Sequence, residues 1–209
     1  MIYILIMRSN VLTNEQRQLL PLMRTFSNSF GLVGGTAIAF HLAHRRSVDF
    51  DLFSYDTFST LSIRNKINQF FKIEQTLSQG EGELTVIVNK VKLTFFHFPY
   101  NIEFKTQFED VIKIPDLLTL ASMKAFALGK RAKWKDYVDL YFITKQFNLK
   151  QIVGQSIQLF GNEFNEKLFR VQLSYFDDVD YSEKVEYMEG FQIPDDEIKK
   201  SLEKISLII

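Results

Sequence analysis

The spacing of apolar and polar positions divides the chain into a strand-rich first half and a helical second half. In the first half, the spacing predicts helices over 11–29, 37–44 and 60–71, and strands over 30–33, 49–53, 71–76, 84–88 and 91–98. Asn89-Lys90 separates the last two strands and predicts a hairpin turn. After Pro115 the pattern is typical of helices, over 115–129, 135–147, 148–160, 163–174 and 195–207. We therefore expect an α+β chain with a mixed α/β part at 1–114 and a helical part at 115–209.

Composition excludes several classes of protein. The 209 residues are 46% hydrophobic and 24% charged, which is typical of a globular chain, and no apolar run is long enough to span a membrane. The chain has no cysteine, which excludes disulfides, thiolate zinc sites and cysteine nucleophiles. The opening MIYILIM lacks a basic region and a cleavage segment, so we do not expect it to be a signal peptide. The expected location is the cytoplasm.

Charge is balanced overall but unevenly distributed. The chain has 25 basic and 25 acidic residues, which argues against a dedicated high-affinity nucleic-acid binder. Residues 175–209 hold ten acids and four bases, a net charge of −6, so the rest of the chain is net basic. A basic cluster without acids is formed by Lys124, Lys130, Arg131, Lys133 and Lys135. This asymmetry suits an anionic substrate, although charged side chains in solvent are the commoner explanation.

Gly34-Gly35-Thr36 lies between a predicted strand and a predicted helix. The N–H groups and the dipole of a helix N-terminus favour phosphate at such a turn, and glycine allows the backbone to approach it. The Thr36 hydroxyl could add a hydrogen bond. A tight turn without a ligand is the alternative interpretation.

Asp49-Phe50-Asp51 follows in a predicted strand. Positions i and i+2 share a face, so both carboxylates point the same way and repel each other unless a cation lies between them. Mg²⁺ is the natural cation, because it is held by one or two carboxylates together with substrate phosphates. A solvent-facing strand edge is the alternative.

A second polar block lies further along the chain. In a continuous helix over 124–139, four charged residues would lie within an arc of about 80°: Lys124, Arg131, Lys135 and Asp139. Gly129 and the charged run 130–135 argue against continuity, but either geometry could present one polar face. Asp139 could orient Lys135 or act as a base toward an acceptor hydroxyl, and an ordinary charged helix face is the alternative.

These two blocks resemble the nucleotidyltransferase toxins of the AbiEii/AbiGii (abortive infection) family. The first is Gly34-Gly35-Thr36 with His44-Arg45-Arg46-Ser47-Val48-Asp49-Phe50-Asp51-Leu52-Phe53, and the second is Lys124 with Arg131-Ala132-Lys133-Trp134-Lys135-Asp136-Tyr137-Val138-Asp139-Leu140. The resemblance spans about residues 11–145.

The resemblance implies a polymerase-β-like nucleotidyltransferase core with a mixed, largely antiparallel sheet, followed by helices. It implies transfer of a nucleotide from an NTP to an RNA acceptor, with tRNA as one candidate, or to a protein, using Mg²⁺ or Mn²⁺. It also implies a cognate antitoxin, as in toxin–antitoxin and phage-defence systems. The implied residues are Asp49 and Asp51 as metal ligands, Lys124 and Asp139 as further catalytic residues, and Gly35 and Thr36 as the nucleotide-binding phosphate turn. From the charges and position of the side chains we also expect nucleotide binding by Arg46, Ser47, Arg131 and Lys135.

One position departs from the pattern. Enzymes of this superfamily usually carry a third carboxylate on a later strand, where this chain offers Thr94. Either Asp139 takes over that role, or the enzyme is slow, or the chain is a non-catalytic module that binds NTP or RNA. Of the histidines near the first block, we expect His41 to be packed and His44 to be exposed.

Overall fold

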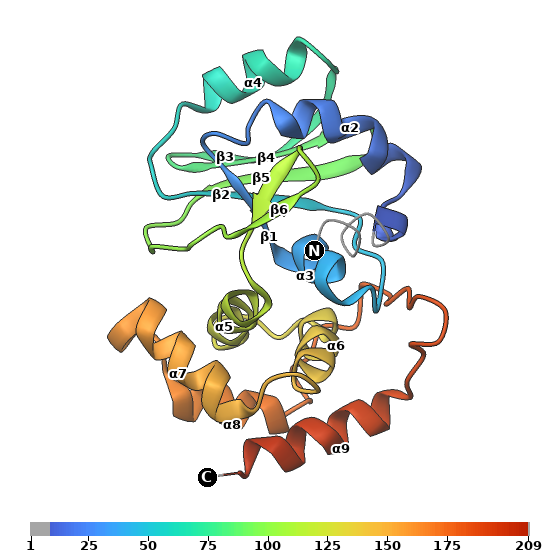
Figure 1. Cartoon of the computed structure of the whole chain (residues 1–209), viewed down its shortest axis with the longest axis vertical. Helices are drawn as coiled ribbons and strands as arrows, with labels where there is room; N and C mark the ends of the chain where they lie inside the picture. The colour runs from blue at the N-terminus through green and yellow to red at the C-terminus, as the bar shows by residue number, and fades with distance from the viewer. Residues whose placement is uncertain (1–8, 209) are drawn as a thin grey trace. The chain divides into compact units, whose positions relative to one another are not determined.

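The computed structural model describes residues 9–208, which form two compact units (Figure 1). The first unit comprises residues 9–41 and 46–116, and the second comprises 42–45 and 117–208. The segment 42–45 thus belongs to the second unit, although its neighbours in sequence belong to the first. The opening residues, for which we expected no signal peptide, lie outside the described residues. Within 9–208 no helix is both long and apolar enough to cross a membrane.

A five-stranded sheet with the strand order β1-β2-β5-β4-β3 organises the first unit. Its strands are β1 (Gly31–Val33), β2 (Phe50–Ser54), β3 (Ile73–Gly80), β4 (Glu83–Val88) and β5 (Val91–His97). Only the β2–β5 pair is parallel, whereas β1–β2, β5–β4 and β4–β3 are antiparallel. This sheet confirms the prediction of a mixed, largely antiparallel architecture.

Side chains alternate between the two faces of the central strands. Phe50 and Leu52 of β2 and Leu93 and Phe95 of β5 are buried, while the residues between them are partly exposed. The apolar face is covered by α2 (Asn14–Arg24) and α4 (Thr60–Asn68), as Figure 1 shows. Phe26, just after α2, meets Phe95 edge-on with ring centroids 4.8 Å apart. The opposite face of β2 and β5, which we call the polar face, carries Asp51, Lys92 and Thr94 beside Phe53 and Phe96.

Short elements complete the first unit. A 3₁₀ turn spans Ser9–Val11, and α3 (Gly34–Leu42) follows β1 directly. The Asn89-Lys90 turn is confirmed, since both residues have positive φ and β4 pairs with β5 on either side of them. The two-stranded sheet of β6 (Thr106–Phe108) and β7 (Ile112–Ile114) was not predicted, because three residues are too few to establish an alternating pattern.

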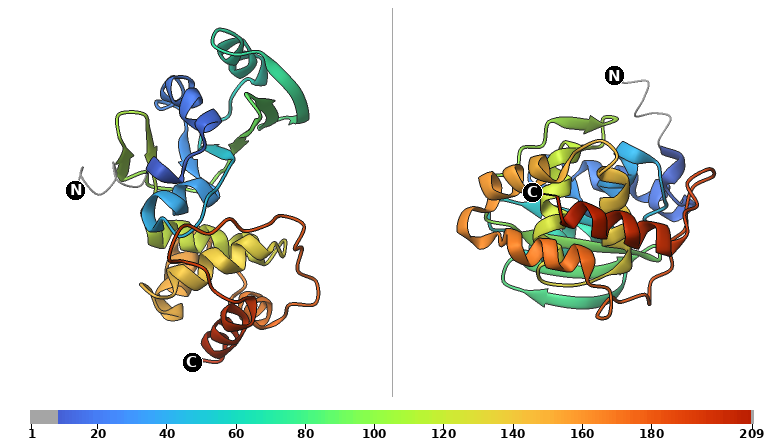
Figure 2. Two further views of the ribbon diagram at one scale, coloured as in Figure 1. Left: turned by 90° about the vertical axis from the view of Figure 1, so that its right-hand side faces the viewer. Right: turned by 90° about the horizontal axis from the view of Figure 1, so that it is seen from below.

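Helices make up the second unit. They are α5 (Leu117–Leu128), α6 (Trp134–Ile143), α7 (Leu149–Phe160), α8 (Glu166–Ser174) and α9 (Asp195–Ser206), with a 3₁₀ turn at Gly161–Glu163. Residues 129–133 separate α5 from α6, so Lys124 and Asp139 lie on different helices. A long connection, 175–194, leads from α8 to α9, which pack side by side (Figure 2).

Candidate active site

Asp49 and Asp51 lie at the start of β2, on the polar face of the sheet. The burial pattern of β2 directs Phe50 and Leu52 into the core and Asp51 to the opposite face. Thr94 of β5 is the register partner of Asp51, and parallel neighbours point to the same side. Thr94 therefore occupies the neighbouring position at which a third carboxylate was expected.

The β1–α3 turn lies directly against the Asp51 carboxylate. Gly34 has φ of +70°, and a Cβ placed on it would be only 2.2 Å from Oδ2 of Asp51. Glycine is required at this position for two reasons, the left-handed backbone and the close approach of the carboxylate. Gly35 follows in the first turn of α3. The glycine turn and Asp51, one acid of the pair, are thus adjacent within the first unit. From the sequence, Gly34 had been identified only as part of the Gly34-Gly35-Thr36 motif.

Thr36 and Ser47 hold the loop that leads into the acidic strand. The Thr36 hydroxyl is buried and donates to the backbone oxygens of Asp49, at 2.5 Å, and of Ser47, at 3.3 Å. Nε2 of Gln16 donates to the same Ser47 oxygen at 2.9 Å. Because its proton is engaged with the backbone, we assign the Thr36 hydroxyl to the loop rather than to a phosphate. Arg46 lies in this loop and is half-buried.

Lys92, to which we had given no role, is a neighbour of the acidic pair Asp49 and Asp51. It lies on β5, two residues before Thr94, and its Nζ is 2.8 Å from Oδ2 of Asp49. Both side chains are about one-third exposed. Alternation along β5 could have indicated this contact, because Lys92 and Thr94 share the face that carries Asp51.

The chemistry of these donors fits a single hard cation. Within residues 9–208 no group of three or more His, Cys, Asp or Glu side chains could hold a metal ion. The protein thus supplies the two carboxylates of Asp49 and Asp51. Mg²⁺ is commonly held by one or two carboxylates, with phosphate and water oxygens completing the octahedron. Asp49 and Asp51 fit that requirement.

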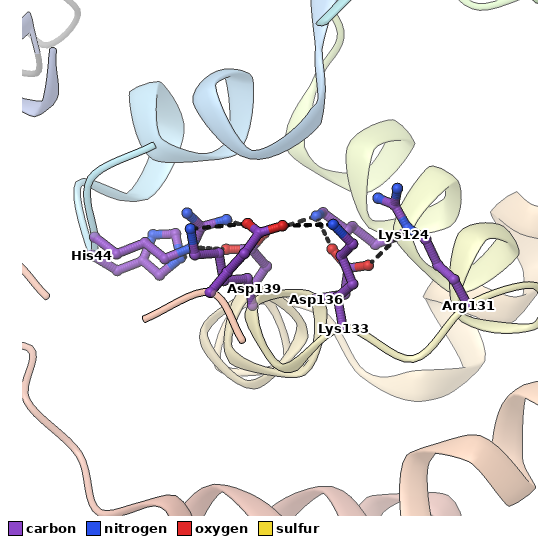
Figure 3. A network of polar contacts seen from close by, with 9 residues as sticks. His44, Lys124, Arg131, Lys133, Asp136 and Asp139 are labelled. Atoms are coloured by element: carbon purple, nitrogen blue, oxygen red, sulfur yellow. Dashed lines mark hydrogen bonds and ion pairs between the residues drawn. The ribbon is translucent and has the colours of Figure 1, made fainter. Parts of the chain in front are cut away.

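Lys124 and Asp139 belong to a buried network of charges in the second unit (Figure 3). The Asp139 carboxylate is fully buried and accepts hydrogen bonds from Nε of Arg45 at 2.7 Å and Nη2 of Arg45 at 2.8 Å. Nε2 of His44 donates to it at 2.8 Å, and Nζ of Lys124 lies 3.0 Å from Oδ2. Lys124 also pairs with Asp136. The network joins α5, α6 and the segment 42–45.

Two buried cations balance two buried carboxylates in this network. Burial alone would raise the pKa of Asp139, but the charges of Arg45 and then Lys124 hold that pKa well below its usual range. Burial would likewise lower the pKa of Lys124, yet Asp136 and then Asp139 raise it. Asp139 is therefore a buried carboxylate that is ionised near neutral pH, which makes it a poor proton acceptor. The geometry favours a positioning role for Asp139 over a role as base.

His44 corrects one expectation. We expected this side chain to be exposed, but it is fully buried and its ring packs against Phe142, with centroids 5.0 Å apart. Burial lowers the pKa of His44, so the imidazole is neutral near pH 7. His41 is half-buried, and its Nε2 donates to the Pro115 oxygen at 2.8 Å.

Arg131 and Lys135, the other predicted nucleotide-binding cations, both contact acids. Arg131 lies 3.3 Å from Asp136, and Lys135 lies 3.1 Å from Glu183. Lys133 also pairs with Glu183, at 2.6 Å, and its hydrogen bond is the main reason that the pKa of Glu183 falls to about 2. Glu183 belongs to the acidic connection 175–194, whose backbone is fixed by isolated bridges from Asp180 to Lys133 and from Tyr187 to Arg45. We had not given Glu183 a role.

The predicted site residues therefore fall into two groups. Within the first unit, the structure brings together the glycine turn, Thr36, Ser47 and the acids Asp49 and Asp51. Within the second unit, it brings together Lys124, Arg131 and Asp139 through shared ion pairs, while Lys135 pairs elsewhere. Asp136 and Arg45 complete the second group, and Asp136 had been given no role from the sequence.

Comparison with known proteins adds three findings. An uncharacterized protein of Aquifex aeolicus (strain VF5) is 32% identical over 149 residues, which is 68% of this chain and 72% of that protein. A putative nucleotidyltransferase from H. pylori has a similar fold, with a TM-score of 0.59 at 14% identity, covering 92% of both chains. MenT4, the nucleotidyltransferase toxin Rv2826c from Mycobacterium tuberculosis H37Rv, gives a TM-score of 0.59 at 13% identity, covering 92% of this chain and 80% of that chain.

The sequence also matches a family over most of its length. Residues 22–187 match the family described as nucleotidyl transferase AbiEii toxin, type IV TA system. That range includes the glycine turn, the acidic strand and the whole Lys124–Asp139 network. The fold of the two solved structures agrees with this assignment. The chain belongs to the AbiEii family of nucleotidyltransferase toxins.

Proposed function

We propose that this toxin transfers a nucleotide from an NTP to a hydroxyl group of an RNA, such as a tRNA, or of a protein, in a reaction that depends on Mg²⁺ or Mn²⁺. The observation that carries the proposal is the contact between the Asp51 carboxylate and the Gly34 turn. A phosphate-binding turn and a metal-binding acid are both needed at a triphosphate, and here they adjoin. The family description further supports a cognate antitoxin as partner.

The residues of the first unit suggest how the substrate is held. The N–H groups of Gly35 and its neighbours lie at the N-terminal end of α3. The helix dipole favours the binding of phosphate oxygens at that end. Asp49 and Asp51 would hold the divalent cation, which neutralises charge on the phosphates during displacement. Thr36 and Gln16 fix the loop that carries Asp49, so the carboxylates are positioned before substrate arrives.

The reaction forms a bond between the acceptor oxygen and the α-phosphorus and breaks the bond to the β-phosphate, so that pyrophosphate leaves. The acceptor hydroxyl must also lose a proton. Thr94 cannot accept a proton near neutral pH, and the ionised, buried Asp139 is a poor acceptor. We infer that the proton passes to water, which predicts slow turnover, and that Lys124 and Asp139 serve to position the segment 42–45 within the second unit.

The experiment is transfer of label from each α-³²P-NTP to total RNA and to total protein, with Mg²⁺, with Mn²⁺ and with EDTA. Asp49→Asn and Asp51→Asn should each reduce labelling by roughly 10²-fold or more, as expected when stabilisation of the transferring phosphate is lost. Asp56→Asn, an exposed acid just beyond the other end of β2, is the matched control and should retain activity. Full labelling in Asp51→Asn would contradict the site. NTP binding without labelling would favour the non-catalytic module that Thr94 allows.

A further inference from the structure

Lys92 places a fixed positive charge against one of the two candidate metal ligands. Its Nζ lies 2.8 Å from Oδ2 of Asp49, and the pair is about two-thirds buried. Lys92 lies in β5, which pairs in parallel with β2, and Asp49 is the residue just before β2. The Thr36 hydroxyl holds the backbone oxygen of Asp49, so the contact depends on the strand register and on this hydrogen bond.

On the polar face, the strands β2 and β5 offer no third acid. Thr94 is the register partner of Asp51, and Lys92 contacts Asp49. Among the described residues, no cluster of three or more metal-ligating side chains exists. Two carboxylates carry a charge of −2, and Lys92 reduces it to −1. One divalent cation then makes the local charge +1, whereas a second would make it +3 before any phosphate binds.

Some phosphoryl-transfer sites use two metal ions. We propose that Lys92 is a positioning residue whose charge takes the place of one of them, so that this site takes a single divalent cation. Its ammonium group holds Oδ2 of Asp49, and Asp49 and Asp51 would together hold the cation. In the absence of nucleotide, the same ammonium group offsets the repulsion between the two carboxylates. This inference rests on the proposed function, because it takes Asp49 and Asp51 as the metal ligands.

The test is a count of bound Mn²⁺ per chain by electron paramagnetic resonance, without nucleotide. Wild-type protein should bind one ion that is lost in Asp51→Asn. Lys92→Gln should still bind one ion, with affinity raised roughly three- to tenfold, because a partly exposed cation next to the site no longer opposes it. Lys92→Asp, which makes a third carboxylate on the same face, should bind two ions.

Two controls accompany the count. Lys113→Gln removes one exposed lysine from the same unit, far along the chain on β7, and should bind Mn²⁺ as the wild type does. Lys92→Arg keeps the charge and should also resemble the wild type, which separates the effect of charge from any disturbance of β5.

The possible outcomes distinguish a wrong role for Lys92 from a wrong metal site. Two Mn²⁺ ions in the wild type, or equal affinities in the wild type and Lys92→Gln, would overturn the role of Lys92 and leave the carboxylate site in place. Absence of any Mn²⁺ that depends on Asp51 would overturn the metal site, and with it both the proposed function and this inference.

Discussion

Replacing Asp139 with asparagine tests whether this residue positions the second unit or acts as a base. Asp139→Asn keeps the size of the side chain but removes the charge that faces Arg45, His44 and Lys124. Arg45 is only 2% exposed, so its guanidinium would lose both charge-assisted bonds while it stays out of water. We expect the second unit to be strongly destabilised.

The magnitude follows from the burial of the network. Breaking a buried ion pair by removing one partner costs about 3–5 kcal/mol. In a chain of this size each 1 kcal/mol lowers Tm by about 2–4 °C, so the Tm should fall by roughly 6–20 °C. Glu166→Gln is the matched control, because this acid pairs with Arg170 on the surface of α8, and its loss should cost about 0.3–0.5 kcal/mol.

The assay can be directed at the second unit alone. Trp134 is the single tryptophan of the chain, it is 4% exposed, and it lies at the start of α6. Its fluorescence during urea unfolding therefore reports on the unit that contains the network. Labelling of the acceptor is measured on the same samples, at a temperature where both proteins are folded.

Two results separate the possibilities. Unchanged unfolding together with a large loss of labelling would refute the positioning role and restore Asp139 as a base. A double replacement, Arg45→Met with Asp139→Leu, supplies the converse test. Removing both partners leaves no unpaired charge, so the double variant should be more stable than Asp139→Asn.

Three further predictions follow from contacts within the units. Gly34→Ala should destabilise the protein by about 1–2 kcal/mol in urea unfolding, from backbone strain alone. It should also weaken metal binding in an Mn²⁺ titration, because the new methyl group displaces Asp51. Gly80→Ala, whose methyl group meets nothing within 4 Å, should change neither the stability nor the metal binding. Burial lowers the pKa of His44 below its ordinary 6.5, so below pH 6.5 the unfolded chain binds a proton that the folded chain does not. The free energy of unfolding should therefore fall as the pH drops below 6.5, by at most about 1.4 kcal/mol per pH unit. His44→Gln should flatten that part of the pH profile of urea unfolding. Thr36→Val removes the donor to the loop before β2 and should cost about 1–3 kcal/mol in the same unfolding assay, because the Asp49 oxygen loses this hydrogen bond while Gln16 still donates to the Ser47 oxygen.

Local patterns were sufficient for much of the first unit. Alternation at Asp49-Phe50-Asp51 predicted a strand with one acidic face, and the burial of β2 confirms it. The Asn89-Lys90 turn was predicted because two residues between apolar runs leave little choice of connection. These features depend on neighbours in sequence, and for that reason sequence alone could predict them.

The charged residues of the second unit could not be placed in this way. Lys124 and Asp139 were expected on a polar face, and instead they are buried, because Arg45 and Asp136 neutralise them. Arg45 and Asp139 are 94 positions apart, and no local pattern indicates which distant acid a given arginine will meet. The strand alternation that identified Thr94 applies equally to Lys92, so the sequence could have placed Lys92 on the acidic face.

The segment 42–45 has a consequence for the order in which the protein can mature during synthesis. A ribosome completes every strand of the five-stranded sheet by His97, yet the partners of Arg45 and His44 emerge only later. These partners are Asp139 and the backbone around Tyr187. Until then the arginine remains hydrated, and a nascent chain arrested after residue 116 would keep it so. Closing a contact over so long a separation is a slow step compared with forming a helix or hairpin. The burial of Arg45 therefore has to wait until Asp139 and the residues around Tyr187 have been synthesised, well after the five-stranded sheet can form.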